Sequence, residues 1–447
     1  MIFSLPAEVQ SAMTKLELAG HQAWLVGSTR DLYLGLPPHD WDLTTDALPE
    51  EICKVFAGQP LNRAGEKFGT ISLTGGDKII DVTTFRKDGQ YRDHRRPDSV
   101  AFSRDLFEDL KRRDFTVNAI VYSPTRGVRD YFCGKRDLKK KLIRAIGNAQ
   151  DRFEEDAIRI LRALRFASVL DFSVEERTAE AIHKKKELLS TLPTERILPE
   201  WNRMLCGRNV KRVLTEFSDV IGVLVPEILP AIGFDQLSPF HQYDVWMHTV
   251  NAVAASVPVT EVRLALLFHD ISKPSCLTVD PTGRGHFYGH HKKSARIAKE
   301  VMERMRFPVR QIRAVTELVT YHDSHPKGRA DVKKLLSLLG ESRFRMLVQV
   351  MEADILAHSK WTVKRRLVNL ENIRDTAEQI LSSGECYTLE GLAIKGNDLT
   401  GIGLAGPAVG EALNYALNKV IRGEWENDRE SLLAGILSLR EKKSEGQ

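Results

Sequence analysis

Apolar and polar positions follow two different periods along the chain. Up to about residue 135, short apolar runs of β type stand between turn signals such as Pro37-Pro38 and Gly75-Gly76; these runs are AWLVG, FGTISL, KIIDVTTF and AIVYS. From about residue 140, apolar residues recur every three or four positions, as in AIRILRALRFASVL and TAEAIHKKKELLSTL, which indicates amphipathic helices. We therefore expect an α+β protein, with a small α/β head followed by a chain that is helical to its end.

Two breaks divide the helical part. A chain of 447 residues exceeds what one hydrophobic core usually supports, so several domains are expected. The proline-rich segment PEILPAIGFDQLSPFHQYD marks one boundary, and SSGECYTLEG marks another. The expected parts are a head, a helical neck, a helical middle domain and a helical tail, at residues 1–140, 141–225, 226–380 and 381–447.

The composition is that of an ordinary folded protein. Apolar residues make up 42% of the chain and charged residues 28%, which does not point to disorder. No apolar run approaches the ~20 residues that cross a bilayer, and MIFSLPAEVQ lacks a signal-peptide pattern. The five cysteines form no C-x-x-C pair, which favours reduced structural thiols. We expect a cytoplasmic protein without a membrane partner.

Basic residues are clustered although the net charge is only +5. The clusters lie at Arg92 to Arg96, Lys111 to Arg113, Lys135 to Lys141 and Arg159 to Arg165. They suit a polyanionic partner, but solvated helix faces carry similar runs. Charge alone leaves both interpretations open.

Acidic residues in the head are candidates for metal binding. In HDWDLTT, Asp40 and Asp42 are two positions apart, so on an extended strand both carboxylates point to one face. Mg²⁺ prefers such oxygen ligands, whereas adjacent carboxylates without a cation repel each other. Asp81 in IIDVTTFR is a candidate third carboxylate for the same metals. The alternatives are a solvated strand end and, for Asp81, a buried aspartate paired with an arginine.

Phosphate-binding candidates surround these acids. WLVGSTRD places Gly27 and Ser28 where a strand turns into a helix, with Arg30 close behind. Backbone amides at such a helix start can hold phosphates, and glycine allows their close approach; the alternative is an ordinary helix start capped by Ser28. DLKRRDFTVNAI adds Arg113, whose planar guanidinium suits a phosphate.

One further segment carries charge at regular spacing. RFEEDAIRILRALRF places Asp156, Arg159, Arg162 and Arg165 three residues apart, which on one helix makes a slowly turning stripe. Three arginines headed by an aspartate are unusual for a solvated face. The stripe is therefore a candidate binding surface.

In order and spacing, GSTRD, HDWDL, DLKRRDFTVNA and RFEEDAIRILRALRF closely resemble the bacterial class II CCA-adding tRNA nucleotidyltransferases and their poly(A) polymerase relatives, over about residues 20 to 200. The resemblance implies that Asp40 and Asp42 bind catalytic Mg²⁺ and that Gly27, Arg30 and Arg113 hold a triphosphate. It also implies that Asp156 and Arg159 select the base and that Arg162 and Arg165 support the nucleotide. Ser28 departs from the second glycine that is usual in the family.

The activity implied is the addition of C, C and A to the 3′ end of tRNA from CTP and ATP, without a template. An aspartate acceptor and an arginine donor match the base edges of cytosine and adenine and mismatch uracil. Residues 86–103 resemble the family's flexible loop, which takes part in the switch from C to A and disfavours a CC-only enzyme. A poly(A) polymerase, an A-only or CC-only enzyme and a non-catalytic RNA-binding module remain open.

Histidines and aspartates recur in the middle part, in the order His248, His269-Asp270, His290-His291, His322 and Asp354. A lone histidine on an apolar helix is usually a core residue, but ALLFHDISKP puts His269 and Asp270 at a helix end, where we expect exposed ligands. Imidazole and carboxylate together suit divalent metals.

This spacing resembles the HD metal-dependent phosphohydrolase domain. The resemblance implies that His248, His269, Asp270 and Asp354 hold Mn, Ni or Mg, with His290 and His322 available to a second metal and Lys273 near a phosphate. The middle part would then hydrolyse phosphorylated or 2′,3′-cyclic RNA ends, with the head only gripping RNA as one alternative, or would serve as a scaffold.

The tail resembles the C-terminal segment of these enzymes, which implies contact with the tRNA elbow. Gly396, Gly403 and Gly406 followed by Pro407 indicate turns that lead into helices. A helical cap that packs on the neck is the alternative. No sequence feature indicates the oligomeric state.

Overall fold

The computed structural model describes residues 3–75, 78–89 and 99–444. The chain divides into two compact units, residues 1–229 and 230–447, and each is described by itself. The finer division into head, neck, middle domain and tail stays a prediction. Within the described ranges, none of the helices is long and apolar enough to cross a membrane.

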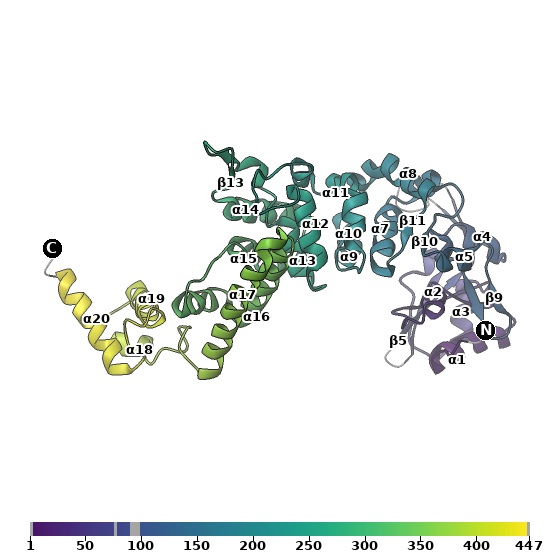
Figure 1. The fold of residues 1–447 in the computed structure, drawn as a ribbon. Helices are drawn as coiled ribbons and strands as arrows, with labels where there is room; N and C mark the ends of the chain where they lie inside the picture. Colours follow the sequence, from purple (N-terminus) through teal and green to yellow (C-terminus); the bar gives the residue numbers. More distant parts are fainter. Residues whose placement is uncertain (1–2, 76–77, 90–98, 445–447) are drawn as a thin grey trace. The chain divides into compact units, whose positions relative to one another are not determined.

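A seven-stranded mixed sheet lies at the centre of the head, in the order β3-β4-β5-β2-β1-β8-β9 (Figure 1). Strand β1 pairs antiparallel with β2 and β8, whereas β2 pairs in parallel with β5. The apolar runs of the sequence form β1, β4, β5 and β8. The sheet strands are β1 (Ala23–Val26), β2 (Trp41–Thr45), β3 (Leu61–Asn62), β4 (Thr70–Gly75), β5 (Lys78–Thr84), β8 (Val121–Ser123) and β9 (Gly127–Arg129).

Both faces of this sheet are covered. Ala23 and Leu25 of β1 pack into a core with helices α1 (Ala7–Leu18) and α3 (Pro49–Val55), whereas Trp24 and Val26 pack into a second core with α4 (Leu106–Lys111). A strand that is buried on both sides needs apolar residues at every position. This explains why AWLV is continuously apolar.

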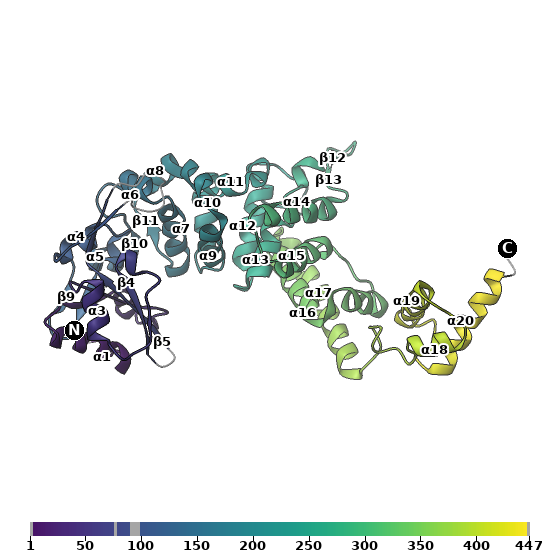
Figure 2. The same ribbon diagram turned by 180° about the vertical axis from the view of Figure 1, so that it is seen from behind.

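Further short strands and helices complete the first unit. Helices α7 and α9 lie side by side in both views (Figures 1 and 2), and Trp201 of α9 is fully buried. The remaining elements are α2 (Ser28–Tyr33), β6 (Arg86–Asp88), β7 (Val100–Phe102), α5 (Gly134–Lys139), β10 (Leu142–Ile143), α6 (Ala149–Glu155), α7 (Ile158–Leu170), β11 (Ser173–Val174), α8 (Glu176–Lys185), α9 (Thr194–Leu205), α10 (Val210–Glu216) and α11 (Ser218–Leu224).

The second unit is built mainly from helices that pack in pairs, α14 with α15 and α16 with α17 (Figure 2). Helix α16 bends at Gly340, where φ is 72°. The elements are α12 (Val245–Ala255), α13 (Thr260–Phe268), β12 (Thr278–Val279), β13 (Gly285–His286), α14 (His290–Arg304), α15 (Val309–Tyr321), α16 (Arg329–Leu356), α17 (Lys360–Ser383), α18 (Gly396–Gly401), α19 (Pro407–Ile421) and α20 (Arg429–Ser444).

The predicted α+β class is confirmed, with a sheet in the head and helices behind it. The expectation of helix alone beyond residue 140 was wrong in detail, because β10 pairs with β11 and β12 pairs with β13. Each of these strands has two residues, which is too short to show a period in the sequence. Residues 90–98 of the expected flexible loop lie outside the described residues.

Candidate active site in the head and a buried histidine-aspartate centre

The turn between β1 and α2 brings backbone to the edge of the sheet. Gly27 has φ 72° and lies just before α2, and a Cβ added to it would lie 3.5 Å from Oδ2 of Asp42. Ser28 begins the helix and donates its hydroxyl to the carbonyl of Val26 at 3.3 Å. The alternative of a helix capped by Ser28 was therefore wrong: the residue before the helix is Gly27, and the hydroxyl points back to the strand.

Carboxylates gather beside this turn. Asp42 of β2 lies opposite Val26 of β1 and opposite Asp81 of β5. Asp40 lies one residue before β2 rather than within it. Burial raises the pKa of Asp42 to about 6, with the charges of Asp81 and Asp40 adding to the rise and Arg113 opposing it. The acids thus crowd together enough to favour a bound cation.

One carboxylate oxygen of Asp81 has no hydrogen-bond partner. Its Oδ1 is buried and accepts no hydrogen bond, and within the described ranges no arginine forms an ion pair with it. A buried carboxylate oxygen without a partner is costly unless a cation or water meets it. The alternative of a structural aspartate paired with an arginine therefore finds no support in these contacts.

Two arginines beside the acids are fixed by carboxylates of their own. Arg113 donates to Oδ2 of the buried Asp109 at 3.0 Å. Arg30 donates to both oxygens of Asp31 at 2.9 Å and to Oδ1 of Asn118 at 2.6 Å. Because these guanidiniums are already oriented, little side-chain entropy would be lost when they meet a phosphate.

The arginine stripe lies on α7, but its aspartate does not. Asp156 has extended backbone (φ −141°, ψ 103°) between α6 and α7. Its Oδ1 accepts from the amide of Ile158 at 3.4 Å, and its Oδ2 accepts from Arg196 of α9 at 2.8 Å. The expectation of one continuous helix was wrong at this point, since the carboxylate bonds a backbone amide at the start of α7.

The three arginines of α7 are all held by carboxylates, and Glu200 lies within ion-pair distance of both Arg162 and Arg165. Arg159 is buried and donates to Glu155 at 2.7 Å and to the carbonyl of Arg112 at 2.8 Å. Arg162 donates to Asp114 at 2.8 Å. Arg165 donates to Glu200 at 2.7 Å and lies 3.6 Å above the ring of Phe166. The stripe is a fixed array of positive charge rather than a solvated face.

A cleft of about 630 Å³ opens between these groups. The sequence candidates that line it are Gly27, Ser28, Arg30, Asp40, Asp42, Arg113, Asp156, Arg159, Arg162 and Arg165. Asp81 does not line the cleft. It lies behind Asp42, which lines the cleft and is opposite Asp81 on the neighbouring strand. The cleft therefore places fixed cations on the same walls as the crowded acids.

Sequence reasoning missed the wall that α9 supplies. Arg196, Glu200 and Arg203 line the cleft, while Ile197 and Trp201 of the same helix are buried. The signal was present as an amphipathic pattern in TERILPEWNRML, with charges every three or four positions. The pattern alone does not show that the polar face lines a cleft, because the polar face of an amphipathic helix usually faces solvent.

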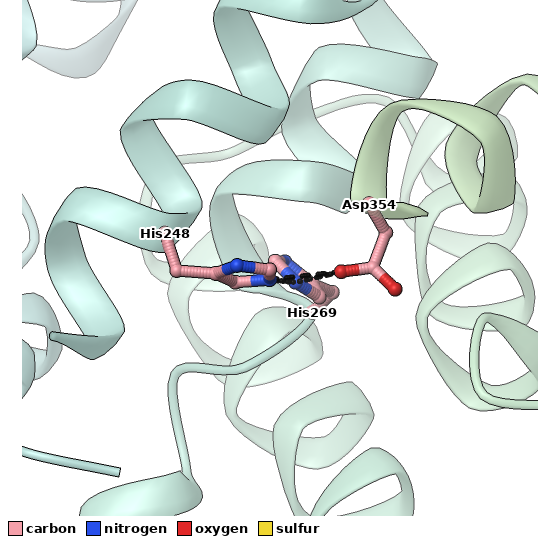
Figure 3. Close-up of side chains that lie close together, drawn as sticks. All are labelled: His248, His269 and Asp354. Atoms are coloured by element: carbon pink, nitrogen blue, oxygen red, sulfur yellow. Dashed lines mark hydrogen bonds and ion pairs between the residues drawn. The ribbon is translucent and has the colours of Figure 1, made fainter. Parts of the chain in front are cut away.

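In the second unit, histidines and aspartates from separate helices meet in a buried centre. His248 of α12, His269 after α13 and Asp354 of α16 point toward one another in Figure 3, with Nε2 of His248 at 2.8 Å and Nε2 of His269 at 3.4 Å from Oδ1 of Asp354. His248 and His269 are fully buried. The expectation of exposed ligands at this helix end was wrong, because helices α12, α14, α15 and α16 pack against α13.

Asp270 bridges this group to a second one. Its Oδ2 lies 3.2 Å from His269 and 3.6 Å from His248, whereas its Oδ1 lies 3.3 Å from His290 and 3.8 Å from His322. Asp270, His290 and His322 form a second set of ligand atoms close enough for one metal ion. Lys273 does not point to a free space for phosphate but pairs with Asp270 at 2.7 Å.

Backbone carbonyls orient the imidazoles. Nδ1 of His269, His290 and His322 lies 2.6, 2.8 and 2.7 Å from a carbonyl oxygen. A donor at Nδ1 leaves Nε2 as the atom that faces the carboxylates, which is the arrangement typical of metal-binding histidine. The imidazoles therefore already have the orientation that a metal ligand needs.

Electrostatics at the centre favour a cation. Burial alone lowers the pKa of His269, but Asp270 and Asp354 outweigh it and raise that pKa to about 10. The pKa of Asp270 is held well below its usual range against burial by His269 and Lys273, and its Oδ1 lacks a hydrogen bond. Positive charge is thus stabilised here, as a proton or as a metal ion.

Comparison with protein families covers most of both units. The poly A polymerase head domain matches residues 23–144, the probable RNA and SrmB-binding site of polymerase A matches residues 171–228, and the HD domain matches residues 243–359. Together with the two sites, these matches define a nucleotidyltransferase of the poly(A) polymerase type that carries an HD domain.

Individual proteins that are similar to this chain show which members of this class it resembles. The CCA-adding enzyme of Streptococcus thermophilus is 31% identical over 446 residues, which cover 98% of this chain and 98% of that one. The CCA-adding enzyme of Ligilactobacillus salivarius is 44% identical over 223 residues, 49% of this chain and 55% of that relative, so this match spans about half its length. The crystal structure of the Bacillus stearothermophilus CCA-adding enzyme in complex with CTP is 27% identical over 98% of both chains, with a TM-score of 0.73. The chain belongs to the family of the CCA-adding enzymes.

Proposed function

We propose that this chain adds C, C and A to the 3′ end of tRNA from CTP and ATP, without a nucleic-acid template and with release of pyrophosphate. The observation that carries the proposal is that Asp40 and Asp42 line the same cleft as Asp156 and Arg159. Metal-binding acids and a base-selecting pair are the two parts that such a reaction needs. Membership of the family and the similar structure with bound CTP support the same substrates.

Asp156 and Arg159 would take the place of a template. A carboxylate only accepts hydrogen bonds and a guanidinium only donates them. Cytosine N4 and adenine N6 are amino donors that suit Asp156, and their ring acceptors suit Arg159. Uracil presents O4 to the acid and N3–H to the guanidinium, so both contacts are repulsive. Arg196 fixes the orientation of the Asp156 carboxylate through its 2.8 Å bond.

The phosphates would lie at the β1–α2 turn. Gly27 lets backbone approach closely, and Arg30 and Arg113 supply fixed positive charge, each held by its own aspartate. Arg162 and Arg165 extend this charge along α7. The chain's contribution at this end of the cleft is to bind and orient the triphosphate.

Asp40, Asp42 and Asp81 would hold Mg²⁺. The crowding that raises the pKa of Asp42 and the unpartnered Oδ1 of Asp81 fit a cation at this place. Bound Mg²⁺ supplies charge stabilisation on the attacking and leaving oxygens of an in-line displacement. The cleft walls position the tRNA 3′-hydroxyl against the α-phosphate, so that a new P–O bond forms as the bond to pyrophosphate breaks.

One incubation tests the proposal. The chain is mixed with a tRNA transcript that lacks CCA, with CTP and ATP offered separately and together, and products are resolved by length. The proposal predicts C addition with CTP alone and three added residues with both nucleotides. Long A tails would indicate a poly(A) polymerase, and A addition only to a transcript that already ends in CC would indicate an A-only enzyme. Arrest after two C residues with both nucleotides present would indicate a CC-only enzyme.

A second activity is favoured by the buried centre of the second unit. We infer that His248, His269, Asp270 and Asp354 bind a divalent metal, Mn, Ni or Mg, and that His290 and His322 with Asp270 hold a second one. The oriented Nε2 atoms fit this use, as does Oδ1 of Asp270, which accepts no hydrogen bond although Nε2 of His290 lies 3.3 Å from it. A metal there supplies an activated water for phosphoester hydrolysis, which suits phosphorylated or cyclic RNA ends.

Metal binding and hydrolysis are tested separately from nucleotide addition. Asp270→Ala is expected to abolish the rise in melting temperature that Mn²⁺ or Ni²⁺ produces and any hydrolysis of 3′-phosphorylated RNA, while CCA addition continues. Asp42→Ala is expected to do the reverse. Asp375→Ala, an exposed aspartate of α17, is the matched control. If Asp270→Ala left metal stabilisation unchanged, the centre would not be a metal site.

We also propose that the tail, residues 381–447, contacts the tRNA elbow. The described part of the tail has its own core, which includes Leu399, Leu417 and Leu432. A chain that ends at residue 385 keeps the whole of α17 and the ion pairs of Glu385 with α16, and it is expected to bind tRNA more weakly and to bind CTP unchanged. Equal tRNA affinity would assign the tail to packing alone.

A further inference from the structure

Asp109 of α4 lies behind the head cleft, where several parts of the head meet. Its side chain is fully buried and does not line the cleft. Its Oδ1 accepts from Nε and Nη2 of Arg112 at 3.1 and 2.5 Å and from the amide of Arg86 at 3.4 Å. Its Oδ2 accepts from Arg113 at 3.0 Å and from the hydroxyl of Thr44 at 3.1 Å. Both carboxylate oxygens are therefore shared by donors from β2, from β6 and from the residues after α4.

Three of these partners lead to different parts of the cleft. Arg113 lines the cleft and is a proposed phosphate ligand. The carbonyl of Arg112 accepts from Nη2 of Arg159 at 2.8 Å, which helps to fix the guanidinium that is proposed to select the base. Thr44 follows Asp42 by two positions on β2, so both side chains lie on one face of the strand. One carboxylate thus connects the proposed places of the metal, the phosphates and the base.

A second aspartate of the head has the same burial but different partners. Asp137 of α5 is also fully buried, and its Oδ2 accepts from Thr116 at 2.8 Å and from Arg144 at 3.0 Å. Asp137 and these two partners are described residues that do not line the cleft. Burial of an ion pair is by itself weak evidence of a role in stability. The feature that distinguishes Asp109 is that both of its arginine partners line the cleft.

We propose that Asp109 is a positioning residue for nucleotidyl transfer. It orients Arg113 toward the phosphates directly, and it orients Arg159 toward the base through the carbonyl of Arg112. Burial raises the pKa of Asp109, but the two arginines outweigh it and lower this pKa to about 2, so the carboxylate is charged at neutral pH. The inference deepens the proposed CCA addition and rests on it for turnover, whereas nucleotide binding requires only the cleft.

The test replaces Asp109 by asparagine in the full chain, with Asp137→Asn as the matched control. An amide offers one acceptor oxygen and a donor NH₂ group, so it can accept from only one of the two arginines. Dissociation constants are measured with Mg²⁺ for CTP, UTP and inorganic tripolyphosphate. Any binding to the second unit is the same in both variants, so their difference isolates the head cleft.

The sign of the change in affinity separates orientation from charge. Removal of a negative charge near a phosphate site strengthens phosphate binding by electrostatics alone. Lost orientation of Arg113 acts in the opposite direction, and we expect Asp109→Asn to bind tripolyphosphate about three- to tenfold more weakly. Because Arg159 keeps its bond to Glu155, the preference for CTP over UTP should fall by a smaller factor, about threefold.

Steady-state incorporation into a tRNA transcript that lacks CCA gives a readout that a purely structural role does not change. Unfolding lowers the concentration of active enzyme and so lowers the apparent kcat, but it leaves KM and the ratio of kcat/KM for CTP over UTP unchanged. Misplaced arginines change both quantities. We therefore expect Asp109→Asn to raise KM for CTP and to lower this ratio, and Asp137→Asn to keep both values.

A second pair of variants tests the same carboxylate with less risk to the fold. Thr44→Val keeps the shape of a fully buried side chain and removes the hydroxyl that donates to Asp109. Its control is Thr84→Val, because Thr84 of β5 is equally buried and donates to the carbonyl of Ala47. Loss of one of several donors to Asp109 is expected to raise KM for CTP and to weaken tripolyphosphate binding about twofold, relative to Thr84→Val.

The outcomes separate this inference from the proposed function. Tripolyphosphate binding by Asp109→Asn that is equal to or tighter than that of the unmodified chain would overturn the inference. If Asp109→Asn does not fold, equal constants in Thr44→Val and Thr84→Val would overturn it. An unmodified chain that binds CTP but adds no nucleotide would refute the proposed function alone, and the binding constants then decide the inference. An unmodified chain that does not bind CTP would overturn both.

Discussion

Replacement of Asp156 by asparagine tests base selection with almost no change in shape. The carboxylate accepts from Arg196 at 2.8 Å and from the amide of Ile158 at 3.4 Å. An asparagine oxygen can keep one of these contacts, but its NH₂ group adds a donor that an aspartate does not have. That donor can face O4 of uracil, so we expect Asp156→Asn to admit UTP.

The size of the effect follows from the contacts. One base-edge contact with the wrong partner is worth about 1–3 kcal/mol of discrimination, and about 1.4 kcal/mol is a factor of ten. Because Arg159 still opposes N3–H of uracil, only part of the selection is lost, and the ratio of kcat/KM for CTP over UTP should fall about 10–100-fold. The Asp156–Arg196 pair is partly exposed, so the fold should lose only about 1 kcal/mol.

The assay is steady-state incorporation into a tRNA transcript that lacks CCA, with CTP, ATP and UTP offered singly. Asp151→Asn is the matched control, since Asp151 is an exposed aspartate of the preceding helix α6. A ratio of CTP to UTP that stays within twofold of the unmodified chain, in a variant that still adds C, would refute base selection by Asp156.

Three further outcomes follow from single contacts. Gly27→Ala places a Cβ at φ 72°, which should cost about 1–2 kcal/mol and raise KM for CTP, as kinetics can measure. Asp114→Asn removes the nearer charge partner of Arg162 and leaves Glu200 at 3.6 Å, so it should lower the free energy of unfolding by about 1–3 kcal/mol in urea titration, whereas Asp151→Asn should not. Burial raises the pKa of Asp109 and of Asp114, but neighbouring arginines outweigh it and lower both values to about 2. The two carboxylates therefore stabilise the fold fully above about pH 4 and lose this effect as the pH falls toward 2. Melting temperatures measured across this pH range can show the loss.

Much of the head could be predicted because its signals are local. A doubly covered strand such as β1 must be apolar throughout, and Gly27 lies where the chain turns with positive φ. The sequence places Asp42 and Asp81 on two separate predicted strands, and in the structure the pairing of β2 with β5 brings the two residues opposite each other. The resemblance of several motifs in order supplied the family, which the full-length relatives confirm.

Other features depend on contacts between distant segments. The break at Asp156 arises because its carboxylate bonds both Ile158 and Arg196, and Arg196 lies 40 positions away. The burial of His269 likewise requires helices that meet only in the folded chain, so a local pattern suggests an exposed helix end.

Incorporation by Asp42→Asn, compared with Asp46→Asn one residue after the same strand, β2, tests the central claim most directly. Asp46 bonds Gln22 and does not line the cleft. With CTP, ATP and a transcript that lacks CCA, we expect Asp42→Asn to lose at least about a hundredfold in rate, since charge stabilisation by the metal is worth several kcal/mol, and Asp46→Asn to add all three residues. CCA addition by Asp42→Asn at the rate of the unmodified chain would contradict the assignment of this cleft as the active site.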